Sequence, residues 1–89
     1  MGSKRWTVYT EDKPGTEKIV DKYFEGYTIF RGIGAWKGAK ENALVIEIIT
    51  GPDEPLAGNI VKAMAEEIRE VNSQQAVLFT LTDTIQILV

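Results

Sequence analysis

GYTIFRGIGAWKGAKENALVIEIIT, residues 26–50, is the stretch of this chain that decides its fold. Residues 27–37 alternate between two faces and carry glycines two positions apart, which predicts a first strand that bends or bulges there. Residues 37–42 are rich in Gly, Lys and Asn and predict a turn. Residues 43–50 are almost continuously apolar, which is typical of a central strand covered on both faces. The stretch therefore predicts a β-hairpin at the centre of the fold.

The flanking segments predict two helices and the remaining strands. The first helix has an apolar stripe at helical spacing, with Thr16 as its cap and Gly26 as its stop. The second helix, residues 56–71, keeps the 3.6-residue apolar period over four turns. Alternation of apolar and polar residues predicts further strands at residues 5–10, 76–81 and 85–89.

This order of elements predicts an α+β, ferredoxin-like β-α-β-β-α-β domain with an additional C-terminal strand. Right-handed crossovers place two helices on one face of an antiparallel sheet ordered 4-1-3-2. The other face is left open, and it is too apolar to be freely solvated. Its expected residues are Arg5, Thr7, Tyr9, Val45, Glu47, Ile49, Ile29 and Ile33. We expect this face and the C-terminal strand to pack on a second copy, making a homo-oligomer.

Composition excludes several classes of function. The 89 residues form one domain, 1–89, with residues 1–4 expected to be disordered or a cloning remnant. The chain has no cysteine and no histidine, which removes thiolate catalysis, zinc–thiolate sites and the usual general base near neutral pH. No apolar run is long enough to cross a bilayer. We expect a cytoplasmic, non-enzymatic protein without metal or cofactor that does not bind membranes.

The charge of the chain is unevenly distributed. The net charge is −3, yet residues 31–41 carry Arg31, Lys37 and Lys40 against one anion, a local charge of +2. An acidic body is a poor general binder of nucleic-acid polymers, because their backbones repel it. The cationic hairpin suits one small anion instead.

The hairpin also holds the parts of a small ligand site. Phe30 and Trp36 flank the glycines and offer stacking surfaces, and the cations lie beside them. A phosphate-binding loop is disfavoured, because the spacing Gly-x-Gly-x-x-x-Gly matches neither the dinucleotide fingerprint nor a Walker loop. In the alternative interpretation, Trp36 is a packing residue and the lysines are solvated turn charges.

A glutamate completes the predicted site. Glu47 interrupts an apolar strand, so it either pairs with Arg5 or Arg31 across the sheet or marks a ligand pocket. The predicted ligand-binding residues are Arg31, Trp36, Lys37, Lys40, Glu47 and Tyr9.

Several of these residues carry a resemblance. Tyr23-Phe24-x-Gly26-Tyr27-Thr28, Gly32-x-Gly34-x-Trp36-Lys37-Gly38, Glu41 and Gln74-Gln75-Ala76-Val77-Leu78 resemble small ferredoxin-like proteins of bacteria and their phages, which share an FxGyT…GxW hairpin. The layout is more weakly similar to PII-like and CutA-like trimers, which bind small ligands at subunit clefts. The resemblance implies a non-catalytic oligomer that binds a small anionic, nucleotide-like ligand, and a phage origin would imply sequestration of a host immune signal.

A different class of function fits the same residues. The alternative is a protein-interaction module that binds a partner protein through the open face or an edge strand. An enzyme comes third, because Glu47 and Arg31 are the only polar pair that the sequence nominates for catalysis.

Overall fold

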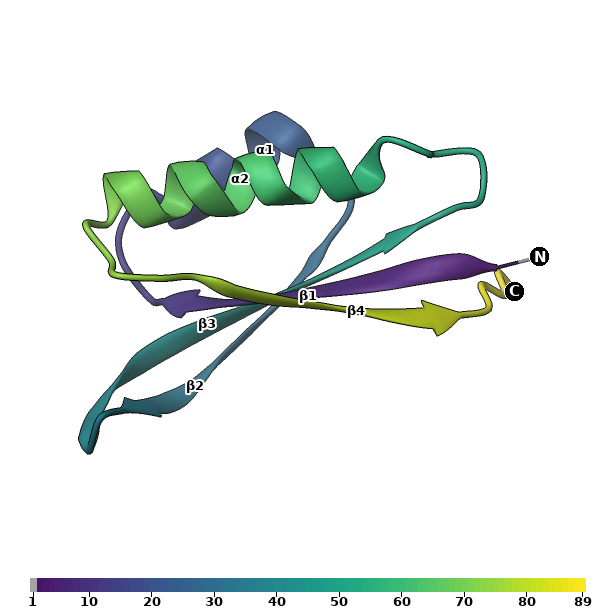
Figure 1. Cartoon of the computed structure of the whole chain (residues 1–89). Helices are drawn as coiled ribbons and strands as arrows, with labels where there is room; N and C mark the ends of the chain where they lie inside the picture. Colours follow the sequence, from purple (N-terminus) through teal and green to yellow (C-terminus); the bar gives the residue numbers. More distant parts are fainter. Residues whose placement is uncertain (1) are drawn as a thin grey trace.

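The computed structural model describes residues 2–89 and has two layers, a four-stranded sheet and two helices that cover one of its faces (Figure 1). Along the chain its elements are β1 Ser3–Glu11, α1 Thr16–Tyr23, β2 Thr28–Trp36, β3 Ala39–Thr50, α2 Ala57–Val71 and β4 Leu78–Thr84. All neighbouring strands are antiparallel, in the order β2-β3-β1-β4. The predicted ferredoxin-like α+β fold and its sheet order are confirmed.

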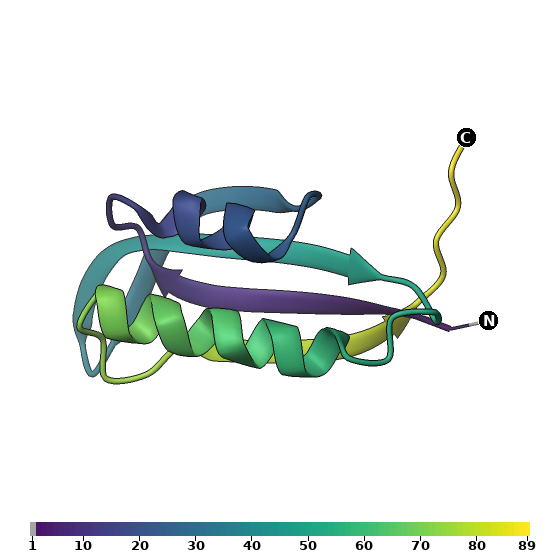
Figure 2. The same cartoon turned by 90° about the horizontal axis from the view of Figure 1, so that it is seen from above.

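The core lies between the two central strands, β1 and β3, and the two helices. Leu44, Ile46 and Ile48 alternate along β3 toward the helices and are at most 1% exposed. Val61 and Ile68 of α2 are fully buried against the same core. Each such aliphatic side chain contributes about 1.5–3 kcal/mol on burial. Seen from above in Figure 2, α2 runs above the β1–β4 side of the sheet and α1 above the β2–β3 side. Neither helix is both long and apolar enough to span a membrane within residues 2–89.

Trp6 closes the end of the core near the chain termini. Its ring is 8% exposed, and its indole N–H donates to the Thr50 hydroxyl at 2.9 Å. A Cβ built on Gly58 would lie 3.1 Å from the Trp6 ring, so α2 approaches this ring through a residue without a side chain. The indole hydrogen bond is the polar link between β1 and the end of β3.

Replacing Thr50 by valine should therefore destabilise the protein. The indole N–H would stay buried without an acceptor, which costs about 1–3 kcal/mol of unfolding free energy. Urea unfolding followed by Trp fluorescence measures the loss. The matched control is Thr80→Val, an exposed threonine of β4, where we expect a change within about 0.5 kcal/mol. Equal effects of the two substitutions would contradict this role of Thr50.

The turn of the hairpin is shorter than predicted. Lys37 and Gly38 form a two-residue turn with φ of 50° and 81°, and β3 starts directly after it at Ala39. Left-handed φ values at both residues match the twist of a two-residue hairpin turn. Every residue of Thr28–Trp36 has a direct partner in β3, so of the predicted bend or bulge at the glycines the bulge is absent.

The ends of the first helix also differ from prediction. Gly15, with φ of 90°, precedes the helix, and Thr16 is its first residue instead of its cap. The buried Thr16 hydroxyl donates to the Lys13 carbonyl at 3.0 Å. The helix stops at Tyr23 because Phe24 is extended, so Gly26 is not its stop.

The chain termini correct two expectations. Ser3 and Lys4, expected to be disordered, belong to β1, and Ser3 lies opposite Thr84. Residues 85–89 form no strand within the chain. The additional C-terminal strand is therefore absent from the sheet of the described residues.

The prediction that Ile29 and Ile33 lie on the open face of the sheet is wrong. Ile29 lies opposite Ile46, so Ile29 and Ile33 are on the helix-covered face. Phe30 and Trp36 lie on the open face instead. The register decides this, because residues directly opposite each other in an antiparallel pair point to the same side.

Candidate functional site

One hollow of the described chain, which we call the hairpin cavity, has a volume of about 660 Å³. It lies where the hairpin β2–β3, the end of β1 and the α2–β4 loop meet. In Figure 1 this end of the hairpin curls away from the helix layer.

Two aromatic side chains line the hairpin cavity. Trp36 is the last residue of β2 and is 57% exposed. Tyr9 lies on β1 between Val45 and Leu78 and is 43% exposed. The Lys37 ammonium lies 5.8 Å from the centre of the Trp36 ring. Trp36 and Tyr9 thus offer ring surfaces to a planar ligand on the open face.

A pair of carboxyl groups, from Glu11 and Glu41, lines the cavity. Glu41 lies opposite Gly34, and Glu11 lies opposite Ala43, so the two glutamates are diagonal neighbours on the open face. Their shared hydrogen bond raises the pKa of Glu41 and lowers the pKa of Glu11. The Lys13 ammonium also lies 3.3 Å from the Glu11 carboxylate. The pair can accept hydrogen bonds and can exchange one proton.

This pair makes stability depend on pH. The pKa of Glu41 is raised above 4.5 in the folded protein. The contribution of Glu41 to the free energy of unfolding is therefore full below pH 4.5 and is lost as the pH rises through the pKa of the folded state. The pKa of Glu11 is lowered, so the contribution of Glu11 to stability is present at neutral pH and is lost as the pH falls through its folded-state pKa. Glu41→Gln should thus unfold at higher urea than the unchanged protein at pH 7, and the difference should vanish near pH 4. Urea midpoints between pH 4 and 7 test this.

The matched control for this series is Glu66→Gln on the exposed side of α2. Its midpoints should follow those of the unchanged protein over the same pH range. If Glu41→Gln and Glu66→Gln shift the midpoint equally, the coupling of Glu11 and Glu41 does not affect stability.

A buried polar network holds the α2–β4 loop against the cavity. Asn72 is 5% exposed, and its side-chain N–H donates to Thr16 at 3.1 Å and to Gln74 at 3.2 Å. Gln74 also accepts from the Thr10 hydroxyl at 2.5 Å. Ser73, between them, has a left-handed φ of 54°. These bonds fix the backbone of residues 73–76 where it lines the cavity.

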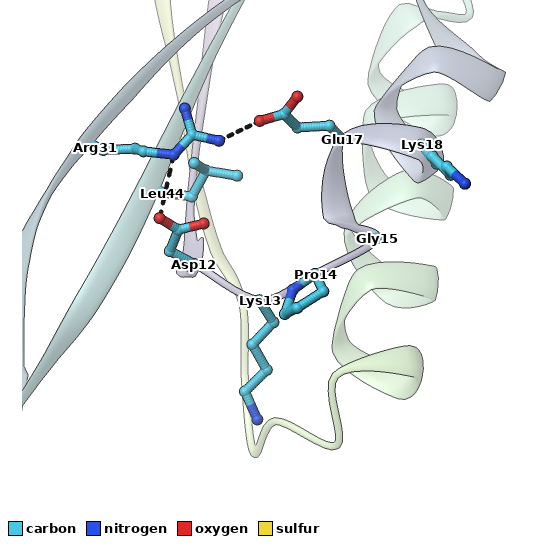
Figure 3. A pocket seen from close by; sticks show the side chains of 8 residues that line it. All are labelled: Asp12, Lys13, Pro14, Gly15, Glu17, Lys18, Arg31 and Leu44. Carbon is cyan, nitrogen blue, oxygen red and sulfur yellow. Dashed lines mark hydrogen bonds and ion pairs between the residues drawn. The ribbon is translucent and has the colours of Figure 1, made fainter.

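A second hollow of about 420 Å³ lies between β2 and the start of α1. Figure 3 shows Arg31 reaching from β2 between Asp12 and Glu17, while Lys18 points away. Arg31 Nε lies 3.2 Å from Asp12, and its guanidinium also pairs with Glu17. Because two carboxylates already neutralise Arg31, this hollow is a link between the hairpin and α1 and not a free anion site.

The structure brings only some of the predicted site residues together. Tyr9 and Trp36 line the hairpin cavity, and Lys37 adjoins it. Arg31 and Lys40 lie on the opposite side of the hairpin from Trp36, because residues of a strand alternate between faces. These two cations therefore do not reach the cavity.

The position of Glu47 does not fit either of its predicted roles. Glu47 lies between Thr7 and Thr28 outside the cavity, and it makes no ion pair with Arg5 or Arg31 among the described residues. Arg31 is on the other face of the sheet, so the two cannot meet across it.

Three contributors to the cavity were missed in the sequence: Glu11, Glu41 and the loop 73–76. The two glutamates are separated by 30 positions, and only the strand register makes them neighbours. The only hint in the sequence that the loop contributes to a site is a pair of glutamines, Gln74 and Gln75, between the end of a helix and an apolar strand. No three His, Cys, Asp or Glu side chains gather to hold a metal ion within residues 2–89.

Comparison with known proteins relates the chain to several solved structures. No family model matches the sequence, and no curated protein matches it. CPII of Thiomonas intermedia K12, a nitrogen regulatory PII-like protein bound to ADP, AMP and bicarbonate, superimposes with a TM-score of 0.65 and 16% identity. That match covers 100% of this chain and 98% of the other.

Two further structures share the fold. GlnK of B. subtilis in complex with ATP matches with a TM-score of 0.61 and 17% identity, over 93% of this chain and 82% of the other. A phage SAM lyase in complex with S-methyl-5'-thioadenosine matches with a TM-score of 0.53 and 22% identity, over 92% and 80%. At these identities the similarity concerns the fold. The PII-like resemblance is confirmed at that level, and the likeness to small proteins of bacteria and phages through the hairpin motif stays a prediction.

Proposed function

We propose that this protein binds a small adenosine-containing ligand in the hairpin cavity, as part of a homo-oligomer. The observation that carries the proposal is the convergence of two aromatic rings, two carboxyl groups and a fixed loop on one hollow of about 660 Å³, a volume within the range of small-molecule sites. Each of the three structures with this fold holds at least one ligand that contains adenosine: ADP and AMP beside bicarbonate, ATP, and S-methyl-5'-thioadenosine.

Each part of such a ligand has a matching group in the cavity. The adenine ring would stack on Trp36, because stacking on an aromatic side chain needs only a free ring face. The carboxyl groups of Glu11 and Glu41 would accept from ribose hydroxyls or from the adenine amino group. Lys37, at the turn beside Trp36, would pair with an anionic group of the ligand.

The role that we propose is binding without conversion. A protein that only holds such a ligand lowers its free concentration, so sequestration of a nucleotide signal is the biological role that we propose. No residue of the cavity needs to exchange a proton with the ligand for this role.

Isothermal titration tests the proposal directly. The ligands are AMP, ADP, ATP, a cyclic adenine nucleotide and S-methyl-5'-thioadenosine, with GMP as the control for the base. We expect saturable binding of at least one adenosine ligand and weaker binding of GMP. Absence of saturation with every adenosine ligand at millimolar concentration would overturn the proposal.

A second candidate function is an enzyme that acts on S-adenosylmethionine. The carboxyl pair beside Trp36 favours it, because carboxylates and an aromatic face both attract a sulfonium cation. The fold shared with a phage SAM lyase supports the same ligand class. Chromatography of S-adenosylmethionine incubated with the protein would then show S-methyl-5'-thioadenosine growing with time, and Glu41→Gln would reduce its formation. Unchanged S-adenosylmethionine would leave binding alone as the function.

A further inference from the structure

The last five residues form an apolar arm that the rest of the chain leaves uncovered. Ile85, Ile87 and Leu88 are 77%, 81% and 98% exposed, and none of residues 85–89 has a charged side chain. Gln86 holds the base of this C-terminal arm through a hydrogen bond of 3.1 Å to the Ser3 hydroxyl. Figure 2 shows the arm crossing the end of the sheet and projecting beyond it.

A complementary gap lies on the open face of β2. Gly32 and Gly34 lie between Phe30 and Trp36 on this face, and the two aromatic side chains are 54% and 57% exposed. A Cβ built on Gly34 would lie 3.3 Å from the Ala43 Cβ, so the open space is at Gly32. A Cβ built on Gly32 would meet no heavy atom within 4 Å. We call these four residues the glycine notch. Because β2 is an edge strand, its outer backbone groups are also free to pair with another strand.

The arm cannot reach the notch of its own chain. The arm leaves the sheet beside Ser3, whereas Gly32 lies opposite Ala43 and thus level with Glu11 at the other end of β1. The eight steps from Ser3 to Glu11 along β1 span roughly 26 Å at 3.3 Å per residue. Five extended residues span at most about 18 Å. Only the notch of another copy is available to the arm.

We propose that the C-terminal arm of one chain adds as a strand to the outer edge of β2 in a second copy and places an aliphatic side chain in its glycine notch. Addition of an extended segment to a free sheet edge satisfies its backbone groups, and the notch supplies the side-chain pocket. Each copy gives one arm and receives one.

This contact is head-to-tail, because the arm and the notch are different surfaces. Such contacts close into a ring when the rotation between copies permits. The arriving arm would lie beside Trp36, so the second copy would form part of the wall of the hairpin cavity. The inference builds on the oligomer of the proposed function, and its test contains no ligand, so its failure would leave the ligand proposal standing.

Light scattering after size exclusion at about 100 μM protein, compared with the chain mass of 9.9 kDa, tests the contact. The intact chain should have a multiple of that mass. A chain ending at Thr84 and the variant Gly32→Val should both be monomers, because one lacks the arm and the other has a filled notch. Thr28→Val, on the same face of β2, is the matched control and should keep the mass of the intact protein.

A mixing experiment makes the test directional. The truncated chain still has a notch, and Gly32→Val still has an arm, so an equimolar mixture should form a dimer although each alone is a monomer. Far-UV circular dichroism checks that both variants are folded. A monomeric intact chain, an unchanged mass after truncation, or a mixture that stays monomeric would each overturn the proposal.

Discussion

Replacing Trp36 by alanine is expected to weaken binding of an adenosine ligand at least tenfold. Stacking of a base on an aromatic side chain is worth about 1–3 kcal/mol, and 1.4 kcal/mol corresponds to a factor of ten in Kd. Trp36 is 57% exposed in the chain, so its removal should leave the unfolding free energy nearly unchanged. Titration calorimetry with the tightest ligand of the panel measures the loss.

Two controls separate stacking from other effects of this substitution. Trp36→Phe keeps a ring and should recover most of the affinity. Leu81→Ala removes an apolar side chain that is 47% exposed on the other face of the sheet, and it should not change Kd. The mass of each variant is measured in parallel, because Trp36 also borders the glycine notch. An unchanged Kd for Trp36→Ala with intact assembly would remove Trp36 from the site.

The largest effect on stability is expected for Ile46→Ala. Ile46 is 0% exposed at the centre of β3, and its truncation leaves a cavity in a layer that two helices cover. Such changes cost about 2–5 kcal/mol of unfolding free energy. A domain of this size has about 5–15 kcal/mol in total, so urea denaturation should show a large shift of the midpoint.

The matched control for this change is Ile33→Ala on the same face of the sheet. Ile33 is 71% exposed because the hairpin extends beyond the helix layer. We expect its truncation to change stability by less than about 0.5 kcal/mol. A loss below 1 kcal/mol for Ile46→Ala, or equal losses at both positions, would contradict the assignment of the core.

Local pattern was sufficient for the fold class. The apolar run from Leu44 to Ile48 and the helical period of residues 57–71 require covered surfaces whatever their neighbours are. The crossover rule then leaves one sheet order, and the structure has it. The ends of elements were less predictable, because Lys37 adopts a left-handed φ that its residue type does not indicate.

The site was only partly predictable for a related reason. Trp36 and Tyr9 are aromatic residues in segments whose alternating pattern predicts strands, so the sequence alone indicated both as candidates. Glu11 and Glu41 are ordinary glutamates in the sequence and become a pair only through the register of β1, β3 and β2. For Arg31 the sequence was misleading in the other direction. A cation beside glycines indicates an anion site, but in the structure Arg31 pairs with Asp12 and Glu17.

By itself, the sequence determined the two helices, the four strands of the sheet, their order and the apolar layer, since periodicity and side-chain chemistry act over a few neighbouring residues. It did not determine the end of the chain, where the predicted strand at residues 85–89 is absent. Only the tertiary structure decided which face of the hairpin carries Trp36, which carboxyl groups meet, and where the C-terminal arm leaves the sheet. Those outcomes depend on strand register, and a shift of one residue would move every side chain of a strand to the other face. Gly32 and Gly34 therefore lie on the open face of a strand that pairs with β3 without interruption, and they form no bulge.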